Sequence, residues 1–229
     1  MQIYEFGENH ADILLIQPVD DHDLSGMERE AAAIRAIAGE RFRLIAVRVD
    51  RWNLDLSPWT APAVFGNEDF GDGAKNTLEQ ILPLADGYQK RTVIGGYSLA
   101  GLFALWAGYQ TEAFSGIAAA SPSIWFPGFT DYMAQKRIRT GCVYLSLGDR
   151  EERTRNTVMS KVGAGIRQAH NLLEQQGIPA VLEWNPGNHF REPDLRTAKA
   201  FGWVVNHLSP FHSSGSGNNE KPFLADDPG

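Results

Sequence analysis

Short apolar runs alternate along the chain with stretches whose hydrophobic residues recur at helical spacing. We predict that the apolar runs are strands buried on both faces and that the periodic stretches are helices. The predicted strands cover residues 11–18, 42–49, 92–94, 116–120, 143–147 and 180–184. The predicted helices cover residues 27–38, 74–88, 99–106, 157–176 and 194–208. Strands that alternate with helices in this way are typical of an α/β fold with right-handed crossovers and a parallel sheet.

Proline and the small polar residues refine these boundaries. Ser25 precedes the first predicted helix and is expected to cap it. Pro83 is expected to bend the helix over residues 74–88 or to end it early. Residues 50–73 follow neither period, and we interpret them as a long loop that either lines the substrate site or packs on the surface. We assign residues 1–210 to one domain and residues 211–229 to a polar tail that we expect to be mobile.

The composition fits one domain with a proper core and excludes several classes of function. The chain has 229 residues, a formal net charge of −7 and no basic run, so nucleic acid and anionic membranes are poor partners. We find neither a secretory leader nor an apolar run long enough to span a membrane, and we expect a cytoplasmic protein. Cys142 is the one cysteine, which excludes an internal disulfide and a cysteine-based metal site.

The stretch RTVIGGYSLAGLFALWAGY, residues 91–109, joins a buried strand to a helix through a glycine-rich turn. The turn follows the G-x-S-x-G pattern of a nucleophile elbow around Ser98, except that Ala100 takes the last position. In such an elbow the serine backbone is forced toward positive φ, and its neighbours must be small because strand and helix pack closely. We predict that Ser98 is an exposed nucleophile. The alternative is an ordinary strand–helix turn that contains a serine.

A serine nucleophile needs a base, and the base needs a third group that fixes its tautomer. In a parallel sheet such groups lie in loops after the carboxyl ends of strands. Of the six histidines, His22 and His189 lie just after predicted strands, and His189, which follows the last strand, is our predicted base. The loop after residue 147 offers Asp149, Glu151 and Glu152 as the acid. The order serine, acid, histidine is that of α/β-hydrolases.

An oxyanion hole needs two backbone N–H groups aimed at the developing negative charge. One should come from Leu99, directly after the nucleophile. The other should come from the loop after the first predicted strand, where Val19 and Asp20 are the candidates. The acidic cluster at residues 20–23 could instead suggest a metal site, but consecutive ligands cannot easily surround one ion, and we expect neither a metal nor a cofactor.

The segments GGYSLAGLFALWAGYQ and FSGIAAASPSIW, residues 95–110 and 114–125, resemble an esterase family of α/β-hydrolases. This family includes the esterase D and enterochelin esterase types, and its elbow usually reads G-H-S-x-G-G-x-x-A. Tyr97 replaces the usual histidine here, and Ala100 replaces a glycine. The resemblance extends from Phe70 to His189. It implies that the acid lies three residues after a glycine, which selects Glu151, after Gly148.

The resemblance implies a single α/β-hydrolase domain with a mostly parallel central sheet and helices on both faces. The short connection after residues 116–120 predicts an open cleft without a large cap domain. We also expect Trp52, Tyr97 and Trp125 to bind substrate.

The predicted activity is that of a serine hydrolase acting on a small-molecule carboxylic ester. It would use a Ser98–His189–Glu151 triad and form an acyl-enzyme. Family members cleave siderophore trilactones, thioesters, acetylated sugars and feruloyl esters, so the resemblance does not select the substrate. The alternatives are a thioesterase or S-acyl-glutathione hydrolase, and a catalytically idle hydrolase fold used for binding.

Overall fold

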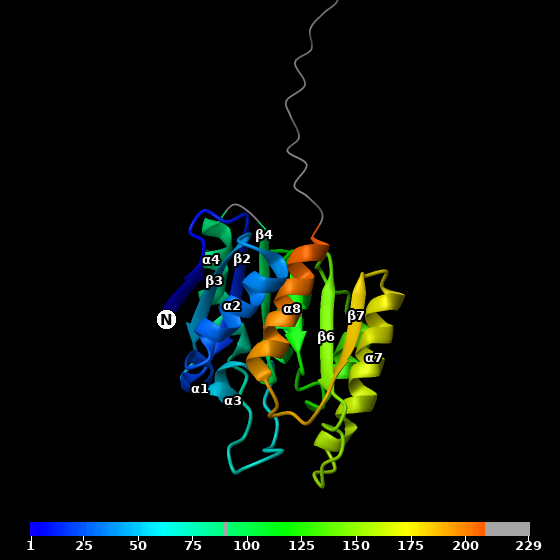
Figure 1. Cartoon of the computed structure of the whole chain (residues 1–229). Coiled ribbons are helices and arrows are strands. Elements are labelled where there is room, and N and C mark those ends of the chain that lie inside the picture. Colours follow the sequence, from blue (N-terminus) through cyan, green and yellow to red (C-terminus); the bar gives the residue numbers. More distant parts are fainter. Residues whose placement is uncertain (89–90, 209–229) are drawn as a thin grey trace, which may run out of the picture.

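The computed structural model describes residues 1–88 and 91–208, and within these ranges seven strands form one sheet (Figure 1). The strand order is β1-β3-β2-β4-β5-β6-β7. Neighbouring strands are parallel except for β1, which pairs with β3 in the antiparallel direction. The strands are β1 (Gln2–Gly7), β2 (Ile13–Val19), β3 (Phe42–Arg48), β4 (Arg91–Tyr97), β5 (Gly116–Ala120), β6 (Val143–Gly148) and β7 (Ala180–Asn185). The mostly parallel sheet confirms the prediction.

The edge strand β1 is the one strand of the described residues that the apolar pattern missed. Its residues are exposed or half-buried, with Tyr4 and Phe6 packed against the core while Gln2, Ile3 and Glu5 face solvent. A strand with one wet face carries alternating rather than continuous hydrophobicity, and six residues of alternation were too few to distinguish it from a loop.

Helices cover both faces of the sheet, and each face has its own hydrophobic core. The helices α2 (Met27–Ala38) and α8 (Pro193–His207) pack on one face and lie in front of the sheet in Figure 1. The opposite face carries α4 (Ala74–Gly87), α5 (Leu99–Gln110), α6 (Phe129–Gln135) and α7 (Val162–Gln175). The helix α5 is buried from Leu99 to Tyr109, which explains why it is apolar on all sides.

One local prediction about a helix end was wrong. Ser25 does not cap α2, which begins after Gly26 without a side-chain cap. Instead the Ser25 hydroxyl donates to the His22 carbonyl and closes a short helix, α1 (Asp21–Leu24), which Asp20 caps by accepting a hydrogen bond from the Asp23 N–H.

Of the two outcomes predicted for Pro83, the early end of the helix does not occur, because α4 continues to Gly87. Pro83 lies on the exposed side of α4, where water can satisfy the carbonyl group that loses its N–H donor.

The strands β2 to β7 all run in the same direction. Their carboxyl ends therefore meet at one edge of the sheet, the lower edge in Figure 1. The loop of residues 56–73 lies at this edge, after the short helix α3 (Trp52–Asp55). A 3₁₀ turn (Met159–Lys161) leads into α7. The connection from β5 to α6 spans only residues 121–128, and no cap domain is inserted there.

No helix within residues 1–88 and 91–208 is long and apolar enough to cross a membrane. The polar tail predicted for residues 211–229 lies outside the described residues.

Candidate active site

Ser98 lies on a sharp turn between β4 and α5, with φ of 55° and ψ of −119°. Two hydrogen bonds fix this turn to the neighbouring strand and its loop. The Ser98 N–H donates to Ala120 O at 3.1 Å, and the Ser123 N–H donates to Ser98 O at 3.0 Å. A positive φ at a non-glycine residue is strained, and it persists here because the surrounding hydrogen bonds hold it. The predicted elbow geometry is therefore present.

Close packing explains how the elbow tolerates alanine at its last position. A Cβ atom on Gly96 would lie 2.6 Å from the Cβ atom of Ala100, which no real structure accommodates without a shift. Because Gly96 has no side chain, the methyl group of Ala100 fills that space. Position 96 therefore requires glycine, whereas position 100 can hold alanine in place of the usual glycine.

The structure brings Ser98, His189 and Glu151 into one chain of hydrogen bonds. Ser98 Oγ lies 3.0 Å from His189 Nε2, and His189 Nδ1 lies 2.7 Å from Glu151 Oε2. An ionised carboxylate only accepts hydrogen bonds, so Nδ1 carries the proton and Nε2 is free to accept one from the serine hydroxyl. This is the tautomer that a general base opposite Ser98 requires.

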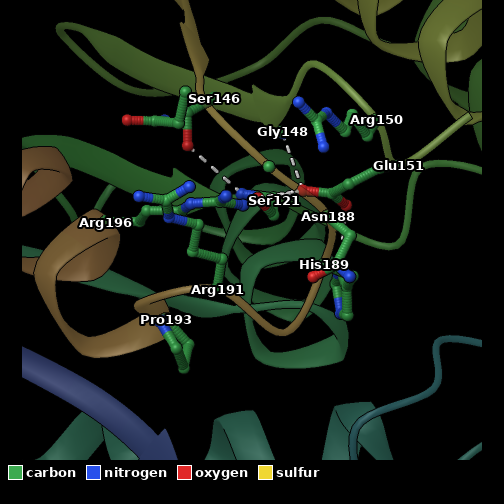
Figure 2. Close-up of polar contacts among 12 residues, drawn as sticks. Ser121, Ser146, Gly148, Arg150, Glu151, Asn188, His189, Arg191, Pro193 and Arg196 are labelled. Carbon is green, nitrogen blue, oxygen red and sulfur yellow. Dashed lines mark hydrogen bonds and ion pairs between the residues drawn. The ribbon is translucent and has the colours of Figure 1, made fainter.

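The other oxygen of Glu151 accepts three further hydrogen bonds (Figure 2). The donors are the Gly148 N–H at 2.7 Å, the Ser121 hydroxyl at 2.8 Å and the Arg196 guanidinium at 3.0 Å. The Glu151 side chain is 4% exposed, so its charge depends on these donors for stabilisation. They hold the carboxylate in one orientation against His189.

The structure separates Glu151 from the two competing acids. Asp149 Oδ1 accepts from the Gly187 N–H at 2.7 Å, which ties the β6 loop to the β7 loop, and its side chain is 54% exposed. Glu152 is a surface residue whose carboxylate lies 3.6 Å from Arg167. Neither carboxylate contacts His189 in the described residues, whereas Glu151 does. His22, the other histidine that follows a strand, is exposed in α1.

The oxyanion-hole candidates lie after the carboxyl ends of two neighbouring strands, β4 and β2. Leu99 is the first residue of α5, directly after Ser98, at the positive end of the helix dipole. Val19 ends β2, and Asp20 follows it into α1 at the same edge of the sheet. The assignment of their N–H groups to an oxyanion hole stays a prediction.

Of the three predicted substrate-binding residues, Tyr97 has the most defined contacts. Its hydroxyl donates to His189 O at 2.7 Å and accepts from Arg196 at 3.1 Å, and its ring centroid lies 5.0 Å from the imidazole. Burial, with a smaller contribution from the charge of Glu151, raises the pKa of Tyr97 to about 12. These contacts tie Tyr97 to the histidine loop.

The two predicted tryptophans, Trp52 and Trp125, pack against the core on the face of the sheet opposite α2 and α8, together with the loop of residues 56–73. Trp125 is half-buried, and its ring lies 6.0 Å from those of Phe65 and Phe70. Trp52 in α3 is half-buried against the same core. Phe70 is buried and Phe65 is 48% exposed, so the loop of residues 56–73 packs on the body and also presents an aromatic side chain to solvent.

Sequence reasoning missed two residues of this site. The Ser123 hydroxyl lies 3.2 Å from Ser98 Oγ, and Arg196 in α8 holds Glu151. Ser123 falls in the S-P-S segment quoted for the family resemblance, which was a usable signal. Arg196 lies 45 residues from Glu151 in a helix with several charged residues, and no local pattern distinguishes it.

No family model and no curated protein matches this chain. Solved structures do match it. An IroE-like serine hydrolase from Shewanella oneidensis aligns with a TM-score of 0.68 at 13% identity, covering 86% of this chain and 71% of that one. A siderophore hydrolase, EstA from Aspergillus nidulans, aligns with a TM-score of 0.59 at 17% identity, covering 90% and 94%.

A carboxylesterase from Bacillus cereus gives a TM-score of 0.59 at 16% identity, covering 90% of this chain and 94% of that one. These likenesses, together with the elbow and the sheet order, show that the chain has the α/β-hydrolase fold. At such low identity the likeness concerns the fold alone.

Proposed function

We propose that this protein is a serine hydrolase that cleaves a small-molecule carboxylic ester. The observation that carries the proposal is the unbroken chain of hydrogen bonds from Ser98 Oγ through His189 to Glu151. A serine on a strained elbow, a neutral imidazole and a buried carboxylate are the three groups that acyl transfer needs. The presence of all three argues against an idle fold used only for binding.

The first half of the reaction acylates the enzyme. His189 Nε2 takes the proton from Ser98 Oγ as the oxygen attacks the ester carbonyl carbon, and the carbonyl oxygen becomes an oxyanion. The Leu99 N–H, at the amino end of α5, would donate to this oxyanion, and the second donor would come from Val19 or Asp20. The intermediate then collapses, and His189 gives its proton to the leaving alcohol.

The second half releases the acid. A water molecule gives a proton to His189 Nε2 and attacks the acyl carbon, and the second tetrahedral intermediate expels Ser98 Oγ, which regains the proton. The imidazolium that forms twice in each cycle lies 2.7 Å from the Glu151 carboxylate, which stabilises its charge. Gly148, Ser121 and Arg196 donate to the other oxygen of Glu151 and hold the carboxylate in place throughout the cycle.

The structural neighbours support ester hydrolysis as the reaction class. They are described as siderophore hydrolase, enterobactin esterase, ferulic acid esterase and carboxylesterase. The chain covers only 56% of the enterobactin esterase from Shigella flexneri, so we do not assign the substrate of that protein to this one. We propose an oxygen ester as the substrate, with thioester hydrolysis as the competing activity.

The test is hydrolysis of p-nitrophenyl acetate, butyrate and octanoate by the wild type and by Ser98→Ala. We expect turnover by the wild type and its loss in Ser98→Ala, and the chain-length profile would size the acyl pocket. Ser160→Ala, which removes a hydroxyl from the turn ahead of α7, is the matched control and should behave as the wild type. Matched oxygen and sulfur esters then separate an esterase from a thioesterase. Equal turnover by wild type and Ser98→Ala, without fluorophosphonate labelling of Ser98, would overturn the proposal.

A further inference from the structure

Ser123 contacts the oxygen atom that performs the attack in the proposed reaction. Its hydroxyl lies 3.2 Å from Ser98 Oγ, and the residue is 2% exposed. The proton transfers of the proposed reaction do not involve this hydroxyl, because the chain from Ser98 through His189 to Glu151 is complete without it. A buried polar group in contact with a reacting atom requires an explanation of its own.

The backbone holds Ser123 against the nucleophile elbow. The Ser123 N–H donates to Ser98 O at 3.0 Å, and the Ser98 N–H donates to Ala120 O at 3.1 Å. The connection between these two hydrogen bonds contains Ser121, with a positive φ of 41°, and Pro122, whose ring restricts its own φ. The main chain therefore places Ser123 beside the nucleophile, whatever side chain it carries.

The hydrogen atoms of the two serines decide which one donates to the other. A serine hydroxyl has one hydrogen to donate and two lone pairs that accept. Ser98 directs its hydrogen at His189 Nε2, 3.0 Å away, because the imidazole proton lies on Nδ1. The Ser123 hydroxyl is therefore the donor in the 3.2 Å contact, and it has no other hydrogen-bond partner among the residues that the structure describes.

The length of this contact indicates that it stabilises the transition state more than the resting enzyme. Hydrogen bonds between neutral hydroxyl groups are commonest at about 2.7–2.8 Å, so a contact of 3.2 Å is weak. Hydrogen bonds to an ionised oxygen shorten to about 2.5–2.7 Å and are roughly twice as strong. Ser98 Oγ becomes partly anionic only while its proton moves to His189. An interaction that strengthens at that stage accelerates the reaction.

We propose that Ser123 is a further catalytic residue, whose hydroxyl stabilises the negative charge that develops on Ser98 Oγ. The inference rests on the proposed function, since it assigns a role within the same reaction. During acylation the Ser98 proton goes to His189 Nε2, and a lone pair of Ser98 Oγ forms the bond to the carbonyl carbon. Ser123 donates a hydrogen bond to Oγ during this step, keeps its own proton and forms no covalent bond.

The same hydrogen bond assists the release of the acyl group. When the second tetrahedral intermediate collapses, the bond between the acyl carbon and Ser98 Oγ breaks and its electron pair goes to Oγ. Ser123 donates to this oxygen until His189 has returned the proton to it. Because Oγ gains negative charge in both halves of the reaction, Ser123 should accelerate acylation and deacylation alike and should affect kcat rather than KM.

The test compares Ser123→Ala and Ser123→Thr with the wild type. Ser123→Ala removes the hydroxyl but keeps the backbone hydrogen bond to Ser98 O, and Ser123→Thr restores a hydroxyl. Stopped-flow hydrolysis of p-nitrophenyl acetate gives the acylation rate from the burst and kcat and KM from the steady state. The rate of fluorophosphonate labelling measures the attack by Ser98 without any deacylation. Thermal melting verifies that each variant is folded.

We expect Ser123→Ala to lower the labelling rate, the acylation rate and kcat about tenfold or more, which is the size expected for a hydrogen bond to a charged group. KM should stay within about twofold, and Ser123→Thr should recover most of the loss. The pH midpoint of kcat/KM, which His189 sets, should not move, because Ser123 contacts neither His189 nor Glu151 in the described part of the chain.

Thr140→Val is the matched control. Its hydroxyl donates to Phe114 O at 3.0 Å ahead of the amino end of β6, at the opposite edge of the sheet from Ser98. The variant loses one half-buried hydroxyl donor, as Ser123→Ala loses a buried one, but no contact with the site. We expect wild-type labelling and turnover from it.

Wild-type rates in a folded Ser123→Ala variant would overturn the inference and leave the proposed ester hydrolysis in place. A raised KM at unchanged kcat, a shifted pH midpoint, or equal losses in Ser123→Ala and Ser123→Thr would also overturn it, because these results indicate substrate binding, support of the triad or packing. A wild type that neither hydrolyses esters nor reacts with the fluorophosphonate would overturn the proposed function, and the inference with it.

Discussion

Arg196 donates a hydrogen bond to Glu151 at 3.0 Å, and both side chains are 4% exposed. The same guanidinium donates to Pro186 O at 3.0 Å and to the Tyr97 hydroxyl at 3.1 Å. Arg196 thus connects Glu151, the loop that carries His189 and the residue before Ser98. It lies on the side of Glu151 away from the imidazole, because Oε2 faces His189 and Oε1 faces Arg196. We interpret Arg196 as a positioning residue.

Replacing Arg196 tests this interpretation. Arg196→Met should leave Glu151 buried without its cation and lower the free energy of unfolding by roughly 3–5 kcal/mol. We also expect kcat to fall about tenfold or more while KM changes little, since ~1.4 kcal/mol of lost transition-state stabilisation suffices for that. Urea unfolding and steady-state kinetics measure the two effects.

A lysine at the same position separates charge from geometry. Arg196→Lys keeps the positive charge but has no planar fork to contact Glu151, Tyr97 and Pro186 at once. We expect its stability and its kcat to lie between those of wild type and Arg196→Met. Wild-type kcat in a folded Arg196→Met variant would show that Arg196 serves stability alone.

Neutral, isosteric replacements test which of Asp149, Glu151 and Glu152 is the acid of the proposed triad. Glu151→Gln should lower kcat/KM by about 10³-fold or more, because the amide no longer stabilises the imidazolium and can favour the wrong tautomer of His189. Asp149→Asn and Glu152→Gln are the matched controls, since neither carboxylate contacts His189 in the described residues. A comparable loss in Asp149→Asn, with Glu151→Gln near wild type, would reassign the acid.

The parts of the site that the sequence predicts are those that local rules specify. Ser98 follows from a strand, a small-residue turn and a helix in succession, and His189 follows from its place after the last strand. Glu151 needed the family resemblance, because three carboxylates share its loop. Arg196 could not be predicted, because it reaches Glu151 only through the packing of α8 across the sheet.

The fold shows the same division between local and tertiary causes. The buried strands and amphipathic helices follow from periodicity, whereas β1 is stabilised by pairing with β3 and carries little signal of its own. Pro83 is tolerated inside α4 because it lies on the side of the helix that faces solvent. Which side faces solvent is decided by the core on which the helix packs. In both places tertiary context overrides a local preference.

The close approach of Gly96 and Ala100 predicts a compensating pair of substitutions. Gly96→Ala places a Cβ atom 2.6 Å from the Ala100 Cβ and should destabilise the fold by about 1–3 kcal/mol. Ala100→Gly alone should cost about 1 kcal/mol as a helix substitution. The double variant should recover part of the loss, which a double-mutant cycle of unfolding free energies measures. Strict additivity would show that the two positions are not coupled.

The Tyr97 hydroxyl provides a further test of how the histidine loop is held. Tyr97→Phe removes the donor to His189 O and leaves that carbonyl and Arg196 each without one partner. We expect a loss of about 1–3 kcal/mol in unfolding free energy and a lower kcat. Tyr132→Phe removes a hydroxyl that accepts from Gln110 at the surface and is the control. Equal effects of the two variants would contradict a role for Tyr97 in positioning His189.

Asp23 and Asp21 lie on the same short helix, yet their environments shift their pKa values in opposite directions. Burial raises the pKa of Asp23 to about 6, whereas the Arg48 guanidinium lowers the pKa of exposed Asp21. A carboxyl group with a raised folded-state pKa contributes stability below its unfolded pKa and loses that contribution as the pH rises through the folded pKa. A carboxyl group with a lowered pKa contributes stability above its unfolded pKa and loses it as the pH falls.

Asp23→Asn should therefore become more stable relative to the wild type as the pH rises from about 4 to about 6, with no further gain above that range. The expected gain is roughly 2–3 kcal/mol, from a shift of about two pH units at ~1.4 kcal/mol each. Asp21→Asn is the matched control, and it should be less stable than the wild type at neutral pH and approach it in acid. Urea unfolding across this range measures both variants. A pH-independent difference between Asp23→Asn and the wild type would mean that Asp23 ionises alike in the folded and unfolded states, and that burial does not raise its pKa.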